Sequence, residues 1–303
     1  MLQKKMKICI IIPTFNADDS IGELLDALML QTVKPNEIII IDSSSIDKTP
    51  QIVSKFSVNL ITIPNSEFNH ASTRTFAAKM SKSNILVFLT QDAIPVNNQL
   101  IENLTKNFVD KEVACVGGRQ LPNKRTRPFG RHLRAYNYPP HSFCRTFSDK
   151  ETLGFKTVFL SNSLAAYRKQ YLKEIGWFGY NISSGEDSIA CARLLLEGYK
   201  ICYESDAMVY HAHNYSIKED FMRYVNIGAT HKEFKCILDE FGRPDKEGIK
   251  FLKSEFKFLV KTKRFDLILQ QPIRAVSKFL GYKIGYIFSG AKNNYINSIK
   301  MYK

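Results

Sequence analysis

The stretch EIIIID, residues 37–42, decides the fold. It has four consecutive isoleucines followed by an aspartate. A strand with one face in water alternates apolar and polar residues, whereas a strand covered on both faces reads as an unbroken apolar run. A second such run, Ile8–Ile12, precedes it and leads straight into Pro13. This run is too short for the core of a signal peptide. The two runs therefore predict central strands of a sheet with helices on both sides.

Helical and strand patterns alternate around these runs as far as residue 118. The segment Ser20–Glu23 has the sequence of a capping box and precedes several leucines, which predicts a helix start. The alternation predicts an α/β fold with a doubly wound, mostly parallel, Rossmann-like sheet. Ligands of such sheets bind beyond the carboxyl ends of the strands. Further helices are expected at about residues 49–56, 73–80 and 100–108, and further strands at about 59–63, 85–90 and 113–116.

The pattern changes after residue 118. Residues 119–157 lose their periodicity and are rich in Arg, Pro, Tyr and Phe, which is typical of a long functional or mobile loop. A short helix is expected near 169–175, and two short strands at 200–203 and 207–210.

From about residue 218 onward the pattern is helical. The segments 252–261 and 273–291 place apolar residues on one face and lysines or arginines elsewhere, which predicts basic amphipathic helices. Such helices either lie on a membrane or pack on the catalytic domain, and the sequence leaves both open. We expect a catalytic domain at 1–240, with halves 1–118 and 119–240, followed by a helical C-terminal region at 241–303.

The charge of the chain is strongly positive and unevenly placed. The formal net charge is +14, and from Arg243 to Lys303 there are 14 Lys and Arg residues against 4 Asp and Glu. Such a region is either a solvated surface or one that attracts an anionic membrane or a phosphorylated substrate. No recognised nucleic-acid-binding motif accompanies it, so no nucleic-acid partner is expected. Apolar runs all fall short of a membrane span, and we expect a cytoplasmic protein; peripheral attachment to the inner face of the cell membrane stays open.

The six cysteines form no CxxC pair, and several fall in apolar strand or helix patterns. Buried free thiols in a reducing compartment are therefore expected rather than a disulfide or zinc framework.

Three short segments carry the chemistry. Thr90-Gln91-Asp92 ends a hydrophobic run, Gly185-Glu186-Asp187 opens an apolar helix, and Val209-Tyr210-His211 ends another strand. An acid at a helix start can act as a general base, while Asp92 and His211 can hold a divalent cation against a phosphorylated leaving group. The acids at the helix start are equally explained as caps, because negative charge is favourable there.

Two nucleotide-binding motifs are absent from the sequence. No GxGxxG follows the first strand, and GxxxxGK[ST] occurs nowhere. This argues against a dinucleotide-dependent dehydrogenase and against a P-loop enzyme. A nucleotidyltransferase would show a Gly-, Arg- and Lys-rich loop after the first strand, where this chain has Pro13-Thr14-Phe15-Asn16.

Several co-ordered motifs give the chain a family resemblance over about residues 7–235. They are IIPTFNA at 11–17, IIIIDSSSIDKT at 38–49, EFNHASTR at 67–74, LVFLTQDAIP at 86–95 and SGEDSIACARLLLEGYK at 184–200. With them the chain resembles the family 2 glycosyltransferases of the GT-A fold, and in particular bacterial dTDP-rhamnose-dependent rhamnosyltransferases. The element at 67–74 is the most specific to that branch and suggests dTDP-rhamnose rather than a UDP-hexose.

The resemblance implies a set of donor-binding residues. Asp42 would accept a hydrogen bond from the imide N–H of the pyrimidine, and an acceptor there discriminates the base because its loss leaves a buried donor unpaired. Arg74 would hold the diphosphate near a helix N-terminus, and His70 would orient hydroxyl groups. The full donor-binding set is Pro13, Thr14, Asn16, Asp42, Ser44, His70, Arg74, Gln91 and Asp92.

The resemblance also implies metal, base and acceptor positions. Thr90 replaces the first acid of the family's Asp-x-Asp, so Asp92 remains as a single carboxylate ligand for Mg²⁺ or Mn²⁺, with His211 as the additional ligand. Asp187 would be the general base, and Glu186 and Trp177 would bind the acceptor. A single displacement would invert the anomeric configuration.

The expected function is therefore inverting, metal-dependent transfer of L-rhamnose to a saccharide or lipid-linked saccharide in the synthesis of a cell-surface polysaccharide. Two alternatives stay open. One is a family 2 transferase with a UDP-sugar donor, and the other is a degenerate transferase that only binds polysaccharide or membrane.

Overall fold

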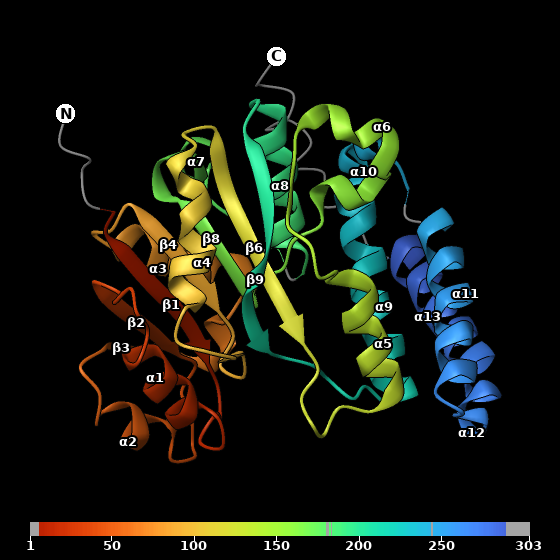
Figure 1. Ribbon diagram of the computed structural model, residues 1–303, viewed down its shortest axis with the longest axis horizontal. Coiled ribbons are helices and arrows are strands. Elements are labelled where there is room, and N and C mark those ends of the chain that lie inside the picture. The colour runs from red at the N-terminus through yellow and green to blue at the C-terminus, as the bar shows by residue number, and fades with distance from the viewer. Residues whose placement is uncertain (1–5, 180–181, 183, 244, 289–303) are drawn as a thin grey trace.

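A computed structural model describes residues 6–179, 182, 184–243 and 245–288. It shows a single nine-stranded sheet with helices on both faces and a group of helices at the C-terminal end of the chain (Figure 1). The strand order is β3-β2-β1-β4-β8-β6-β9-β5, and β7 pairs with β9. The strands are β1 Ile8–Thr14, β2 Glu37–Asp42, β3 Asn59–Thr62, β4 Ile85–Leu89, β5 Ile94–Pro95, β6 Val113–Leu121, β7 Phe143–Arg145, β8 Leu164–Arg168 and β9 Lys200–Tyr210.

Thirteen α-helices accompany the sheet within the described residues. They are α1 Ile21–Met29, α2 Thr49–Val53, α3 His70–Met80, α4 Leu100–Thr105, α5 Pro128–Asn137, α6 Lys150–Leu153, α7 Lys169–Glu174, α8 Glu186–Leu196, α9 Ile217–Glu233, α10 Lys235–Phe241, α11 Asp245–Lys261, α12 Phe265–Ile268 and α13 Gln270–Phe288. The expected α/β class with a helical C-terminal region is confirmed.

Six of the nine strands run in the same direction. Strands β1 to β4 pair in parallel, β8 is antiparallel to both β4 and β6, and β6 and β9 are again parallel. Strands β4, β6 and β9 therefore point the same way as β1, β2 and β3, and only β5, β7 and β8 oppose them. The carboxyl ends of the six strands and the start of β8 consequently meet at one edge of the sheet.

The isoleucine runs of β1 and β2 are buried on both faces, as their sequence predicts. Ile8, Ile10 and Ile12 face the core formed with α1, α2 and α4, whereas Cys9 and Ile11 face the core formed with α3, α7 and α8. All residues of β1 from Ile8 to Ile12 are at most 3% exposed. The period of two along a strand thus explains why an unbroken apolar run is needed here.

The start of α1 differs in detail from its prediction. Ser20 is the N-cap residue, but its backbone has φ −132° and ψ −32° and its side chain makes no capping hydrogen bond. The hydroxyl lies 3.5 Å from the carbonyl oxygen of Ala17 instead. The expected capping box with Glu23 is therefore not formed, because Ser20 lacks the extended backbone that an N-cap serine normally has.

The segment 119–157 is structured, contrary to the expectation of a long loop. It completes β6 and forms α5, β7 and α6, and Pro128 stands in the first turn of α5, where a missing N–H costs nothing. Strand β8 was not predicted, and the two short strands expected at 200–210 form one strand, β9. The expectation of free cysteines is wrong for two of them, because Cys144 on β7 and Cys202 on β9 face each other and form a disulfide.

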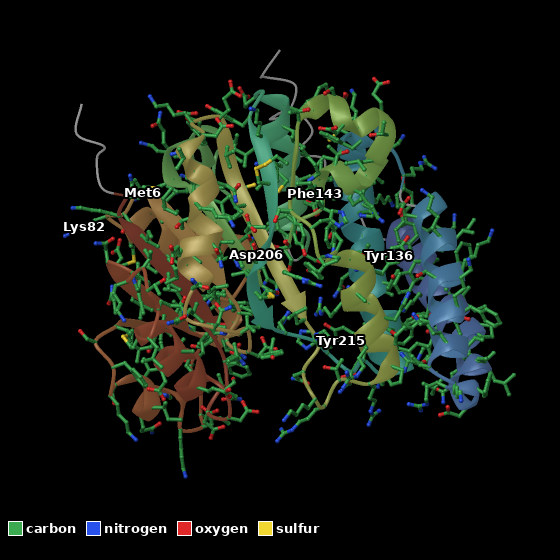
Figure 2. The ribbon with its side chains drawn as sticks, in the orientation of Figure 1. Met6, Lys82, Tyr136, Phe143, Asp206 and Tyr215 are labelled. Carbon is green, nitrogen blue, oxygen red and sulfur yellow. A yellow bond between two sulfur atoms is a disulfide. The ribbon has the colours of Figure 1, made fainter. Side chains whose placement is uncertain are left out.

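The C-terminal helices pack on the rest of the molecule. Helix α13 crosses α9 so closely that a Cβ on Gly285 would lie 1.9 Å from the carbonyl oxygen of Val225, so only glycine fits there. Helix α11 lies against α5, where the rings of Tyr136 and Phe251 meet with centroids 5.1 Å apart. Figure 2 marks Tyr136 on the side of α5 that faces these helices. Positions 289–291 of the helix expected at 273–291 lie outside the described residues.

None of the described helices is both long and apolar enough to cross a membrane. The apolar stretch of α13, for example, is interrupted by Arg274, Lys278 and Lys283.

Candidate functional site

The loops that follow β1, β2 and β4 are tied together at the carboxyl edge of the sheet. The hydroxyl of Thr14 donates to Asp42 Oδ1 at 3.1 Å, and the backbone N–H of Ser45 donates to Asp42 Oδ2 at 2.9 Å. The side chain of Gln91 makes two hydrogen bonds to the backbone of Phe15: its Oε1 accepts from the N–H at 2.8 Å, and its Nε2 donates to the carbonyl at 3.1 Å. Asp42 and Gln91 thus hold together the loops at which the nucleotide pocket is expected.

The other residues expected at this pocket lie around the same loops. Asn16 and Ser44 are exposed and both adopt positive φ angles, 46° and 58°. Asn16 Oδ1 accepts from the backbone of Ile46 at 3.0 Å, and the Ser44 hydroxyl donates to the carbonyl of Ile63 at 2.8 Å. Pro13 is half-buried beside them on β1. Strained backbone at such loops is common where a ligand is held.

Asp92, His211 and His213 form a group that could hold a metal ion. Their ligand atoms all lie within 4.8 Å of one another, with His211 Nε2 3.4 Å from Asp92 Oδ1 and His213 Nδ1 4.0 Å from Asp92 Oδ2. Burial lowers the pKa of His211 to about 3, so its imidazole is neutral and has a lone pair to offer. A carboxylate with two imidazoles suits a divalent cation.

Gln120 fixes the ring of His211. Its Oε1 lies 2.9 Å from His211 Nδ1 and accepts the N–H there, which leaves Nε2 facing Asp92. An outer partner that sets the tautomer of a ligating histidine is a general feature of metal sites. The sequence contained this residue in GGRQLP, but nothing in that segment identified its role.

Asp187 lies at the start of α8 beside the amino end of β8. The N-cap residue Gly185 has φ 77°, a backbone that residues with a side chain rarely adopt, and this turn places both acids in the first turn of the helix. The backbone N–H groups of Asn162 and Ser188 donate to Asp187 at 3.2 and 2.8 Å. Burial, and then the charge of Glu186, raises the pKa of the Asp187 carboxyl to about 7.

The neighbouring acid Glu186 is paired. Arg74 Nη1 lies 3.0 Å from Glu186 Oε1, and the two side chains are 4% and 6% exposed. Asn162 Nδ2 donates to the same oxygen at 3.0 Å. His70 lies at the start of α3 with its Nδ1 3.0 Å from Arg74 Nη1. The structure therefore directs Arg74, His70 and Glu186 toward one another.

A cavity of about 430 Å³ opens beside Asp187. Helices α5, α8, α9 and α13 surround it, and its wall is largely apolar with two arginines, Arg134 and Arg223. Trp177 does not line it; it is half-buried, has φ 64° and packs against the hydrophobic core that includes Ile175 and Phe178. Sequence reasoning placed Arg134 only within a basic segment that was expected to be a loop, and did not single it out.

A carboxylate with a near-neutral pKa and an Asp-His-His group, both at the carboxyl edge of an α/β sheet, are the groups that a metal-assisted group transfer needs. The family profile described as Glycosyl transferase family 2 matches residues 9–176. The chain belongs to this family, and the expected family and enzyme class are confirmed.

The curated relatives extend over almost the whole chain. The O-antigen chain rhamnosyltransferase RfbN of Salmonella typhimurium is 39% identical over 300 residues, 98% of this chain and 95% of the relative. The O-antigen chain rhamnosyltransferase WbaN of Salmonella anatum is 40% identical over 296 residues, 97% and 94% of the two chains. Both relatives therefore match the transferase core and the C-terminal helices together.

Among solved structures, the fold is similar to that of the mannosyltransferase PcManGT from Pyrobaculum calidifontis in complex with GDP-Man and Mn²⁺. The TM-score is 0.59 at 18% identity, and the match covers 99% of this chain and 80% of that one. At this identity the likeness shows the fold, which is the GT-A arrangement that the sequence resemblance implied.

Proposed function

We propose that the protein is an inverting, metal-dependent rhamnosyltransferase that uses dTDP-rhamnose and extends a saccharide or lipid-linked saccharide acceptor. The observation that carries the proposal is the position of Asp187, a carboxyl with a pKa of about 7 that lines a cavity and lies at the same sheet edge as Asp92 and His211. The two Salmonella relatives, both named rhamnosyltransferases, support rhamnose as the sugar.

Asp187 has the properties of the general base in this proposal. A base works best when its pKa lies near the working pH, and the carboxyl meets this condition because of its burial and the charge of Glu186. It takes the proton of an acceptor hydroxyl in the cavity while that oxygen attacks the anomeric carbon. A single attack from the face opposite the leaving group inverts the configuration.

Asp92 and His211 are the proposed holders of Mg²⁺ or Mn²⁺, and His213 is close enough to join them. The bound cation supplies charge that stabilises a departing diphosphate. Gln120 keeps His211 in the tautomer that presents Nε2. Thr14 and Asp42 are proposed to receive the thymine, with Asp42 held in place by Thr14 and Ser45.

The other residues expected to bind the donor or the acceptor also stay proposals, and the structure supports some of them more than others. Pro13, Asn16 and Ser44 lie at the proposed nucleotide pocket, and Gln91 shapes it. Arg74 and Glu186 are proposed to set the position of the site through their ion pair. The position of Trp177, half-buried against the core and outside the cavity wall, gives no support to its role in acceptor binding.

The C-terminal helices are proposed to attach the protein to an anionic membrane surface, in addition to packing on α5 and α9. Between α11 and α13 lies an apolar groove of about 520 Å³, rimmed by Lys253 and Lys257. Phe265 and Leu269 beyond its end are 62% and 78% exposed. A basic surface with exposed apolar side chains fits anionic lipid. The division of the chain near residue 240 is part of this proposal.

A donor screen tests the proposed function. The full chain is incubated with Mg²⁺, a lipid-linked or free saccharide acceptor and either dTDP-rhamnose, UDP-glucose or UDP-N-acetylglucosamine, and the release of nucleoside diphosphate is measured. We expect turnover of dTDP-rhamnose alone, abolished by EDTA. Turnover of a UDP-sugar instead overturns the donor, and binding of dTDP without turnover of any donor indicates the degenerate transferase.

A further inference from the structure

Arg134 lies between the two halves of the site. It projects from α5 so that its Nη2 is 3.5 Å from His211 Nδ1, and it lines the cavity that Asp187 also lines. Its guanidinium carbon lies 5.7 Å from the centre of the Tyr138 ring. The side chain therefore reaches both the proposed metal group and the space where the acceptor would be attacked.

The charge of Arg134 is not neutralised by direct contact with a carboxylate of the described residues, although Asp92 acts on it from a greater distance. No described carboxylate forms an ion pair with it, and its Nε is buried without a hydrogen-bond acceptor. The contact with His211 does not satisfy it, because Nδ1 of that ring already donates to Gln120. In contrast, Arg74 is neutralised by Glu186 and Arg274 by Asp220, each through an ion pair of 3.0 Å or less.

An arginine in this position is costly unless an anion reaches it. Removing a cation from water carries a free-energy penalty that only a partner offsets. The adjoining cavity is open to a ligand, and a guanidinium presents a planar fork of N–H donors that matches phosphate oxygens.

We propose that Arg134 binds the diphosphate of the nucleotide-sugar donor and stabilises it as the leaving group. This rests on the proposed function and adds a residue to it. The acceptor oxygen forms a bond to the anomeric carbon and its proton passes to Asp187. The bond between that carbon and the diphosphate oxygen breaks, and its electron pair stays on the oxygen. The negative charge that develops there lies before Arg134.

Calorimetric binding of dTDP and dTMP tests the inference, because only dTDP carries the second phosphate. Arg134→Gln should bind dTDP about 10- to 100-fold more weakly than the unaltered chain, the loss expected for a hydrogen-bonded charge, and should bind dTMP with unchanged affinity. Arg134→Lys keeps the positive charge but loses the planar fork of N–H donors, so its dTDP affinity should lie between those of Arg134→Gln and the unaltered chain. Arg127→Gln is the matched control, since Arg127 is exposed at the start of the same helix and should not change either affinity.

Equal dTDP affinity in Arg134→Gln and the unaltered chain would overturn the inference, as would an equal loss for dTDP and dTMP. If Arg134→Gln does not fold, as judged by circular dichroism, the Arg134→Lys comparison decides by the same criterion. Binding is measured without transfer, so the outcome is independent of the donor screen. If the protein transfers a sugar other than rhamnose but Arg134→Gln still loses dTDP affinity selectively, the proposed donor is wrong and the proposed role of Arg134 stands.

Discussion

Arg74 Nη1 lies 3.0 Å from Glu186 Oε1, in an ion pair that joins the starts of α3 and α8 and is almost closed to solvent. The two residues are 112 positions apart in the chain. Because consecutive helical residues point about 100° apart, the pairing of Glu186 inward leaves Asp187 to face the cavity. The two adjacent acids therefore differ in environment, and the ion pair fixes which of them is free to react.

Breaking this ion pair should destabilise the fold more than a typical substitution. Arg74→Met or Glu186→Met leaves an uncompensated buried charge, and we expect each to lower the free energy of unfolding by about 3–5 kcal/mol. In the double variant the free energy of unfolding should fall by clearly less than the sum of the two single losses, since no unpaired charge remains. Urea unfolding followed by circular dichroism measures all four proteins, and additive losses would show that the pair is not coupled.

Asp187→Asn should remove transfer while the donor still binds. The amide keeps the size of the side chain but cannot accept a proton, and loss of general-base catalysis costs about 10²–10⁴-fold in rate. Calorimetry should give an unchanged dTDP affinity. Asp26→Asn, on the exposed part of α1, serves as the matched control. Transfer near the full rate in Asp187→Asn would assign the base to another residue.

The pH dependence of the rate should reflect the same carboxyl. Asp187 must be ionised to accept a proton, and burial followed by the charge of Glu186 raises its pKa to about 7. The rate kcat/KM should therefore fall about tenfold for each pH unit below this value. A flat profile between pH 5 and 8, measured with donor in excess and at constant ionic strength, would contradict the assignment.

Stability should show the opposite pH trend. The pKa of Asp187 is raised in the folded state from the 3.8 of a free carboxyl, so the folded state holds the proton more tightly than the unfolded state. This contribution is fully present below about pH 4 and is lost as the pH rises through about 7. Asp187→Asn should thus melt at a higher temperature than the unaltered chain at pH 8, with the advantage shrinking toward pH 5. Thermal scans across this range check the sign.

Gln120 should control metal affinity without being a ligand. Gln120→Leu removes the acceptor that holds the proton on His211 Nδ1, and a lost outer partner typically costs 10–100-fold in metal affinity. Gln120→Glu keeps an acceptor and should retain most of it. Calorimetric titration with Mn²⁺ gives the affinities, and equal affinity in Gln120→Leu would show that the tautomer is set by other contacts.

The parallel half of the fold could be predicted because its signal is local. The runs at Ile8–Ile12 and Glu37–Asp42 are unbroken since each strand is buried on both faces, and polar residues follow directly where the strands end. The predicted metal residues Asp92 and His211 come together for the same reason, as both follow carboxyl ends at one sheet edge.

The other half depends on contacts that are distant in the sequence. Strand β8, LAAYR, is short and rich in small residues, and it forms because β4 and β6 pair with it on either side. Helix α5 is short and polar on average, although its apolar residues share one face, and it packs against α11. No sequence pattern near Glu186 predicts its ion pair with Arg74, and none near His211 predicts its hydrogen bond with Gln120. The expected roles of Glu186 and Arg74 as ligand-binding residues stay predictions for this reason.

Attachment to membranes through α11–α13 should depend on both charge and exposed apolar side chains. Co-sedimentation with vesicles of phosphatidylcholine alone or mixed with phosphatidylglycerol should show binding only to the anionic mixture, weakening as salt screens the charges. Lys253→Gln with Lys257→Gln removes two cations from the groove rim, and at about 1 kcal/mol each the binding should weaken about 30-fold. Phe265→Ser with Leu269→Ser should weaken vesicle binding while leaving the charge of the protein unchanged.

Lys48→Gln with Lys82→Gln is the control with an equal loss of charge, because both lysines are exposed on the sheet domain. Equal weakening by the control pair would show that net charge, rather than this surface, attracts the vesicles.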